Sequence, residues 1–164
     1  MQENSVNRKL SDLDRIDRQI LRILQHRGRI PNVELARDVH LSPTPCLERV
    51  RRLENDGFIK KYVALVDPIK LDLGLSAFIQ VALTKTSTRD LAEFGEQMKR
   101  LPEVLECHMV GGGFDYLIKI RVPDMQGYKL FLGEKLAAID LVSQTHTYVV
   151  IEEVKSETAL SVAK

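Results

Sequence analysis

Arginine side chains are concentrated in the segment 43–56, directly after Ser42. Arg49 and Arg52 are three residues apart, so on a helix they would lie on the same face. An arginine on a helix in the DNA major groove can hold guanine O6 and N7 with two hydrogen bonds. The candidate exposed residues of this helix are Ser42, Thr44, Pro45, Glu48, Arg49, Arg51 and Arg52. The charges alone favour a solvated surface helix instead, because acidic and basic residues nearly cancel.

A second candidate site is the run Gly111, Gly112 and Gly113, followed closely by Asp115. Glycine admits positive φ and lets another molecule approach the backbone. Exposed N–H groups in such a turn could bind a carboxylate, and Asp115 could hold an ammonium group. A free amino acid carries both of these charges. The alternative is a structural hairpin turn, which is the commoner use of a glycine-rich run.

Catalytic chemistry has little support in the sequence. The four histidines are not at metal-ligand spacing, and the neighbours Cys107 and His108 would point to opposite faces of a strand. The sequence contains no nucleophile elbow, zinc-protease motif or phosphate-binding loop. We therefore predict no catalytic residue, no metal site and no cofactor. An enzyme that uses Cys46 or Cys107 is a third alternative, and inactivation by thiol alkylation would reveal it.

The first sixty residues predict three helices. Apolar residues recur at helical spacing over 13–27, with Asp12 or Asp14 as the candidate N-cap. A second helix is predicted over 32–39, with Val33 on its buried face. A third is predicted over 43–56, capped by Ser42, with Leu47 among its buried residues. The short turn between the last two makes a helix-turn-helix, and this context favours DNA as the partner of the arginine-rich helix.

Three further cations flank these helices. Arg29, Lys60 and Lys61 could hold DNA phosphates. After Gly57 the apolar pattern changes to a period of two, which predicts a strand or strand pair over 58–66.

The second half of the chain alternates between strands and helices. We predict a linker over 67–74, strands over 77–83, 104–110, 114–122 and 142–154, and helices over 88–100 and 124–138. The order βαββαβ is that of a ferredoxin-like domain, so the fold class is α+β. Two helices cover one face of such a sheet, and apolar residues such as Phe78, Val81 and Tyr148 could lie on the other. We therefore expect the chain to self-associate.

Composition and charge agree with two functional halves. The chain has 164 residues, 44% hydrophobic and 29% charged, as in ordinary globular proteins. Residues 1–62 carry a net charge of +4 and the remainder −3, which makes the first half the candidate for a polyanionic partner. Two cysteines, a polar N-terminus and no long apolar run predict a cytoplasmic protein without membrane association. The predicted domains are 1–66, which binds DNA, and 75–156, with a C-terminal tail over 157–164.

The segments 32–36 and 41–54, with their Ser-Pro-Thr-Pro-Cys sequence, strongly resemble the leucine-responsive regulatory protein (Lrp/AsnC) family. The segments 13–17, 106–108, 114–117, 121–125 and 147–154 are similar to the family too. The resemblance implies a DNA-binding transcription regulator of amino-acid metabolism genes, associated with the nucleoid. It implies an N-terminal winged helix-turn-helix and a C-terminal RAM, or ACT-like, domain. Family members dimerise through the sheet, commonly form octamers, and bind a free amino acid between dimers, with leucine as one candidate here.

The resemblance also implies site residues. DNA contacts fall on Ser42, Thr44, Pro45, Arg49 and Arg52. Contacts to the effector amino acid fall on Met109, Gly111, Gly112, Gly113, Asp115, Tyr116, Met125, Tyr148, Val149 and Val150.

The chain departs from the family pattern in both turns. His40 stands where relatives usually carry glycine, and histidine tolerates positive φ better than most other residues. Gly111 and Gly113 replace a common Ser or Thr and a common Asp, which leaves the identity of the amino acid open. The alternative function is an ACT-like amino-acid-sensing module that acts through protein partners, for which binding to duplex DNA would lack steep salt dependence.

Overall fold

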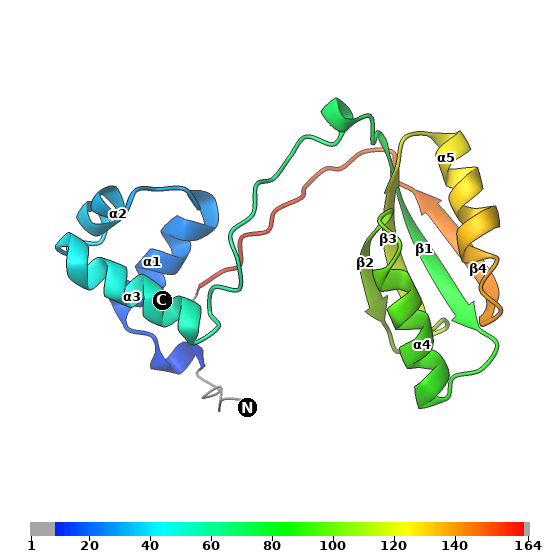
Figure 1. Ribbon diagram of the computed structural model, residues 1–164, viewed down its shortest axis with the longest axis horizontal. Helices are drawn as coiled ribbons and strands as arrows, with labels where there is room; N and C mark the ends of the chain where they lie inside the picture. The colour runs from blue at the N-terminus through cyan, green and yellow to red at the C-terminus, as the bar shows by residue number, and fades with distance from the viewer. Residues whose placement is uncertain (1–8, 163–164) are drawn as a thin grey trace. The chain divides into compact units, whose positions relative to one another are not determined.

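The computed structural model describes residues 9–162 and divides them into two compact units (Figure 1). The helical unit contains the described residues up to Leu65 together with those from Lys155 onward, and the sheet unit is Val66–Val154. The segment predicted as a separate tail, 157–164, therefore belongs with the helical unit as far as it is described. No helix within residues 9–162 is long and apolar enough to cross a membrane.

The helical unit contains α1 (Arg15–His26), α2 (Asn32–Asp38) and α3 (Pro43–Asn55), preceded by a 3₁₀ turn over Leu10–Asp12. Asp14, and not Asp12, caps α1: its side chain accepts from Asp17 N–H, while the Asp17 side chain accepts from Asp14 N–H. This reciprocal capping box satisfies two free N–H groups of the first turn. The core of the unit consists of Leu13, Ile20, Leu21, Leu35, Ala36, Val39, Cys46 and Leu53.

The end of α2 determines how α3 follows it. Leu41 N–H donates to Ala36 O at 2.8 Å and His40 N–H donates to Arg37 O at 3.1 Å. These two bonds form a Schellman motif, which requires a left-handed residue at the position of His40. His40 has φ 59°, so the turn keeps this geometry with histidine where glycine is usual.

Two predictions about the helical unit are wrong. Val33 and Leu47 are exposed, and the buried side of α3 consists of Cys46, half-buried Val50 and Leu53. Residues 58–66, which the structure describes throughout, form no strand. A strand needs a hydrogen-bonded neighbouring strand, whereas this segment bonds to α3, through Ile59 N–H to Leu53 O and the Tyr62 hydroxyl to Glu54.

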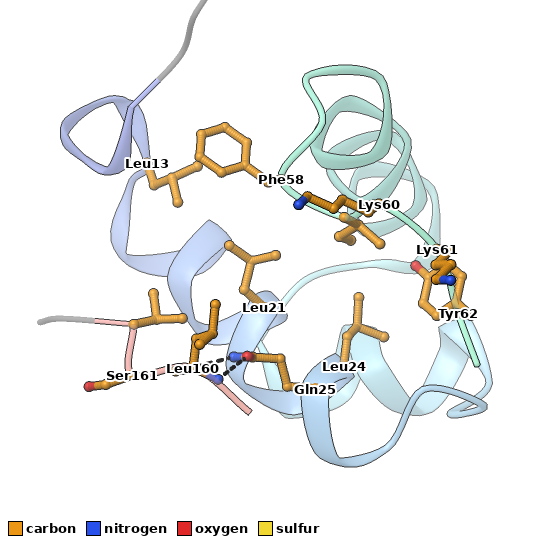
Figure 2. Close-up of a pocket in the computed structure, with 12 residues that line it drawn as sticks. Leu13, Leu21, Leu24, Gln25, Phe58, Lys60, Lys61, Tyr62, Leu160 and Ser161 are labelled. Atoms are coloured by element: carbon orange, nitrogen blue, oxygen red, sulfur yellow. Dashed lines mark hydrogen bonds between the residues drawn. The ribbon is translucent and has the colours of Figure 1, made fainter. Parts of the chain in front are cut away.

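Side chains of α1 hold the backbone of the C-terminal segment (Figure 2). Leu160 N–H donates to Gln25 Oε1 at 2.6 Å, and Gln25 Nε2 donates back to Leu160 O at 3.1 Å. Arg22 Nε donates to Val162 O at 3.4 Å. This segment, α1 and residues 58–62 line a cavity of about 510 Å³.

The sheet unit has the predicted βαββαβ order. It contains β1 (Leu75–Leu83), α4 (Thr88–Lys99), β2 (Val104–Met109), β3 (Tyr116–Val122), α5 (Met125–Leu130) and β4 (Val142–Val149). The four strands are antiparallel neighbours in the order β2-β3-β1-β4, and α4 and α5 lie along one face (Figure 1). A π-helical turn, Phe131–Leu136, continues α5.

Alternation along the strands separates the two faces of the sheet. Ile79 and Val81 of β1 and Ile118 of β3 are buried beneath the helices, where Phe94 and Phe131 pack on them. Phe78 lies on the other face opposite Tyr148. The prediction that Val81 lies on that open face is wrong: Val81 is fully buried, and its neighbour in register on β3, Tyr116, is also a core residue. The last strand ends at Val149, five residues earlier than predicted.

Candidate nucleic-acid interface and effector site

The outward side of α3 is the candidate nucleic-acid interface. At about 100° per residue, Thr44, Glu48 and Arg51 fall within about 60° of one another and opposite the buried Cys46 and Leu53. All three are exposed. The start of the helix is exposed as well, from Ser42 through Pro45, and the Ser42 side chain makes no capping hydrogen bond to the described residues. This end of α3 is therefore accessible to a large ligand.

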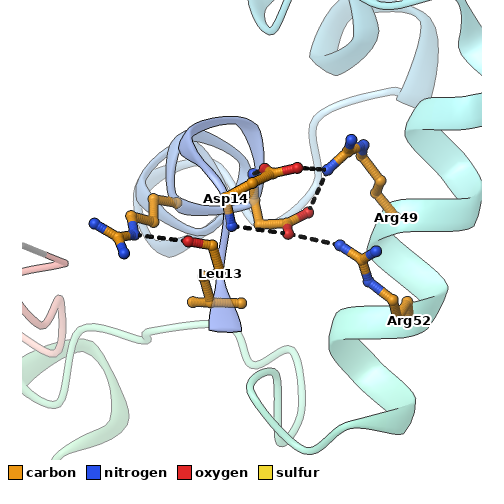
Figure 3. Close-up of polar contacts among 6 residues, drawn as sticks. Leu13, Asp14, Arg49 and Arg52 are labelled. Carbon is orange, nitrogen blue, oxygen red and sulfur yellow. Dashed lines mark hydrogen bonds and ion pairs between the residues drawn. The ribbon is translucent and has the colours of Figure 1, made fainter. Parts of the chain in front are cut away.

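Arg49 and Arg52 lie differently from the rest of the predicted set (Figure 3). Arg49 Nη1 contacts Asp14 Oδ2 at 2.5 Å and Asp17 Oδ1 at 2.9 Å, and Arg52 Nη2 contacts Asp17 Oδ2 at 2.6 Å. The Asp17 side chain is only 2% exposed. Both of its oxygens are thus engaged by guanidinium groups from consecutive turns of α3, in charge-assisted hydrogen bonds.

The pKa of Asp14 reflects the electrostatics of this cluster. Burial acts to raise the pKa of its carboxyl group, but hydrogen bonds from Asp17 N–H and from Arg49, with the Arg49 charge, outweigh it and hold the pKa below its ordinary value. The sequence analysis missed Asp14 and Asp17 as partners of the arginines. The available signal was two acids three residues apart at the start of a helix, but nothing in the sequence aims them at α3.

The flanking cations are accessible. Arg29, Lys60 and Lys61 are all exposed. Lys60 and Lys61 belong to the segment that follows α3 and line the cavity beside α1 (Figure 2).

The glycine turn differs from expectation in one respect. Gly111, Gly112 and Gly113 are exposed, and none has a positive φ; Gly57 is the glycine with positive φ among the residues that the structure describes. A Cβ added at any of the three would meet nothing within 4 Å. Their backbone conformation therefore does not demand glycine, but the missing side chains leave the backbone open to a ligand.

Asp115 is already engaged within the sheet unit. Its Oδ2 accepts from Leu83 N–H at 2.7 Å, and its own N–H donates to Val81 O at 3.0 Å. The next residue, Tyr116, is 5% exposed and donates from its hydroxyl to Leu91 O at 2.7 Å. Tyr116 thus packs in the core beneath α4. The Asp115 carboxylate stabilises the end of β1, whether or not it also binds a ligand.

The other predicted effector residues are divided between the two ends of the sheet. Met109, Met125, Tyr148 and Val149 are exposed and Val150 is half-buried. Tyr116 pairs with Val81 and Val149 with Ala77, four residues apart on β1, which is about 13 Å along the strand. Met109 and the glycines therefore lie at one end of the sheet, and Met125 and residues 148–150 at the other. One chain does not bring both groups around a single small ligand.

The described residues show neither a metal-binding cluster nor an activated thiol. No group of three or more His, Cys, Asp or Glu side chains there could hold a metal ion. Cys46 is buried and Cys107 half-buried, and burial raises the pKa of both thiols. A raised pKa leaves less of the reactive thiolate, so neither cysteine resembles an activated nucleophile.

Similarity to known proteins is extensive in both units. The family described as Lrp/AsnC ligand binding domain matches residues 76–160, and the winged helix-turn-helix DNA-binding family matches residues 13–60. The leucine-responsive regulatory proteins of Escherichia coli K12 and Serratia marcescens are 52% and 53% identical to this chain, covering 96% and 91% of both sequences.

Solved structures agree with these matches. A transcriptional regulator from Neisseria meningitidis, solved in complex with L-Met, superposes with a TM-score of 0.88 at 37% identity, covering 92% of this chain and 97% of that one. AsnC of E. coli superposes with a TM-score of 0.82 at 27% identity, covering 89% and 97%. The helix-turn-helix match disfavours a module that acts only through protein partners, and the relatives are regulators rather than enzymes. The chain belongs to the Lrp/AsnC family of DNA-binding transcription regulators with an amino-acid-binding domain.

Proposed function

We propose that this regulator recognises specific DNA sequences with the outward side of α3 and controls genes of amino-acid metabolism. The observation that carries the proposal is the exposure of Thr44, Glu48 and Arg51 on one side of a helix whose opposite side is buried. In a dimer, two such helices would enter successive major grooves of a pseudo-palindromic site. The proposed DNA-contacting residues are Thr44, Glu48 and Arg51 on this face, with Ser42 and Pro45 at the start of the helix.

Phosphate contacts are assigned to Arg29, Lys60 and Lys61, all of which are exposed. Such contacts add affinity without sequence preference, and each makes the logarithm of the binding constant fall more steeply with salt.

Fluorescence anisotropy with a duplex selected from a random pool by the wild-type protein tests these assignments. Arg51→Ala should lose about 1–3 kcal/mol of discrimination at one base pair. Lys60→Ala should instead weaken all duplexes alike and lower the salt slope by about 1. Lys85→Ala is the matched control, because it removes an equally exposed charge from the sheet unit. Unchanged selectivity in Arg51→Ala would remove Arg51 from the reading face.

The effector proposal is a free amino acid bound between copies of the chain. The two groups of candidate residues occupy opposite ends of one sheet, so a complete site would join the glycine turn of one copy to residues 125 and 148–150 of another. Leucine and methionine are the first candidates, since the E. coli relative is named leucine-responsive and the N. meningitidis regulator was solved with L-Met.

A thermal-shift screen of the twenty amino acids identifies the ligand, because a molecule that binds the folded form raises the melting temperature. Two substitutions then separate the roles of Asp115. Asp115→Asn keeps an oxygen to accept from Leu83 N–H but removes the charge that would hold an ammonium group. It should keep the melting temperature and lose the ligand response, whereas Asp115→Ala should lower both. A full response in Asp115→Asn would place the ammonium contact elsewhere.

The same proposal includes assembly and location. We infer a homodimer formed through the open face of the sheet, where Phe78 and Tyr148 face each other across β1 and β4, assembling further to an octamer. A cytoplasmic, nucleoid-associated protein follows from a DNA partner. Light scattering coupled to size exclusion, with and without leucine or methionine, tests the assembly, and a monomer at micromolar concentration would contradict it.

A further inference from the structure

Arg49 and Arg52 have the side chain that most often reads guanine, yet both are turned toward α1. Arg49 is 26% exposed and lies on the flank of α3, about 60° around the helix from buried Cys46. Its guanidinium contacts two carboxylates, and Arg52 shares the second of them. The pair therefore joins two turns of α3 to the first turn of α1.

Asp17 lies at the centre of this group of ion pairs, and its carboxylate is almost entirely removed from solvent. Withdrawing Arg49 to contact a base would leave that carboxylate short of a partner. Asp17 would keep Arg52, but one oxygen of a buried carboxylate would lose its charged partner, and this cost opposes the gain from a base contact. Binding to DNA therefore favours leaving this cluster intact.

The geometry points to Arg49 and Arg52 as positioning residues rather than base-reading residues: through Asp17 they fix the rotation and depth of α3, so that Thr44, Glu48 and Arg51 face outward. Two guanidinium groups one turn apart, held by the two oxygens of one buried carboxylate, resist both rolling and sliding of the helix. This inference rests on the proposed DNA-reading role of α3 and changes which of its residues determine specificity.

Substitution at Asp17 distinguishes the two possible roles of Arg49, positioning α3 or reading a base, because they predict opposite changes in affinity for DNA. Asp17 is buried and negative, so it does not contact DNA itself. If Arg49 reads a base, Asp17→Asn releases it, removes a negative charge and keeps or raises the affinity. If Arg49 positions α3, Asp17→Asn weakens specific binding at least about tenfold, a change of about 1.4 kcal/mol, and nearly as much as Arg49→Met does.

The experiment uses the full chain and two probes: the duplex selected by the wild type, with its single-base-pair variants, and a random duplex of the same length. Affinities of Asp17→Asn, Arg49→Met and the double variant are measured where circular dichroism shows each to be folded. If Arg49 and Asp17 act together to position α3, the double variant should bind the selected duplex no more weakly than the weaker of the two single variants. The positioning role also predicts a lower ratio of specific to random binding, with the loss spread over several base pairs.

Two controls sharpen the result. Asp38→Asn removes an exposed carboxylate that pairs with Arg27, away from α3, and should leave selectivity unchanged. Arg49→Lys retains a cation for Asp17 but replaces the rigid guanidinium fork, which matches guanine O6 and N7, with a flexible ammonium group. It should bind within about threefold of the wild type at every base pair if Arg49 only positions the helix, whereas a base-reading role predicts a selectivity change at one base pair.

Three results would overturn the inference. The first is a loss of selectivity confined to one base pair in Arg49→Met. The second is unchanged or tighter binding in Asp17→Asn. The third is an unchanged ratio of specific to random binding in folded Arg49→Met, which would leave the cluster with a stabilising role alone. Failure of the proposed function is distinguishable, because the wild-type protein itself would then show no preference for the selected duplex over the random one.

Discussion

Replacing His40 with glycine should stabilise the helical unit. His40 occupies the left-handed position of the Schellman motif that ends α2, with φ 59°. A side chain at this conformation crowds the following carbonyl oxygen, which costs about 1–2 kcal/mol for a residue with a Cβ. Because the side chain is exposed, its removal sacrifices little packing.

The gain is partly offset in the unfolded chain. Glycine has more backbone freedom to lose on folding, which costs about 0.5–1 kcal/mol. The free energy of unfolding should therefore rise by about 0.5–1 kcal/mol. For a unit of this size, that raises the melting temperature by about 2–8 °C. The measurement is thermal and urea unfolding, followed by circular dichroism at 222 nm.

Two controls accompany the substitution. Arg37→Gly places the same residue inside α2, where φ is helical, and should cost about 1 kcal/mol. Asp72→Gly relieves the second left-handed non-glycine residue among those described, φ 55°, and should stabilise the sheet unit by a similar amount. A lower melting temperature in His40→Gly, with an unchanged dependence on urea concentration, would refute the assignment of strain to the backbone of this turn.

Three further outcomes test the packing and electrostatics. The free energy of unfolding should fall as the pH drops below about 4, since the Asp14 carboxyl has a folded-state pKa below its unfolded value of about 3.9; its stabilisation is complete above that value and lost as the pH falls through the folded-state pKa. Asp14→Asn should weaken this dependence below about pH 4, and identical curves would contradict the role of the pair with Arg49. Cys46, fully buried with a raised pKa, should resist iodoacetamide in the native protein and react in urea, so native alkylation at the unfolded rate would show that the core opens. Phe94→Ala should lower the free energy of unfolding of the sheet unit by about 3–5 kcal/mol, since the ring is fully buried 4.6 Å from that of Tyr116, and a loss below about 1 kcal/mol would disprove tight packing there.

Local patterns predicted the elements of the fold well. The three N-terminal helices and the βαββαβ order follow from spacing and caps, which are properties of neighbouring residues. The strand over 58–66 was wrong because alternation records a preference for extended backbone but not the presence of a pairing partner. The prediction that Val33 and Leu47 are buried was wrong for a related reason. Apolar spacing shows which residues lie on the apolar face of a helix, but the neighbouring helices determine how much of that face is covered.

The candidate site was less accessible to sequence reasoning. Residue type and position on α3 identified a set of polar and basic side chains, but the ion pairs of Arg49 with Asp14 and Asp17 join residues more than thirty positions apart. No local pattern encodes such a contact. Likewise, the hydrogen bond from Leu83 N–H to Asp115 depends on how β1 meets β3, which only the assembled sheet determines.

The pair of hydrogen bonds between the Gln25 side chain and the Leu160 backbone has a consequence for biosynthesis. The two residues are 135 positions apart in the chain, and the whole sheet unit lies between them. On the ribosome, α1 therefore emerges long before the segment that packs on it, and its apolar flank stays uncovered while the strands are being made.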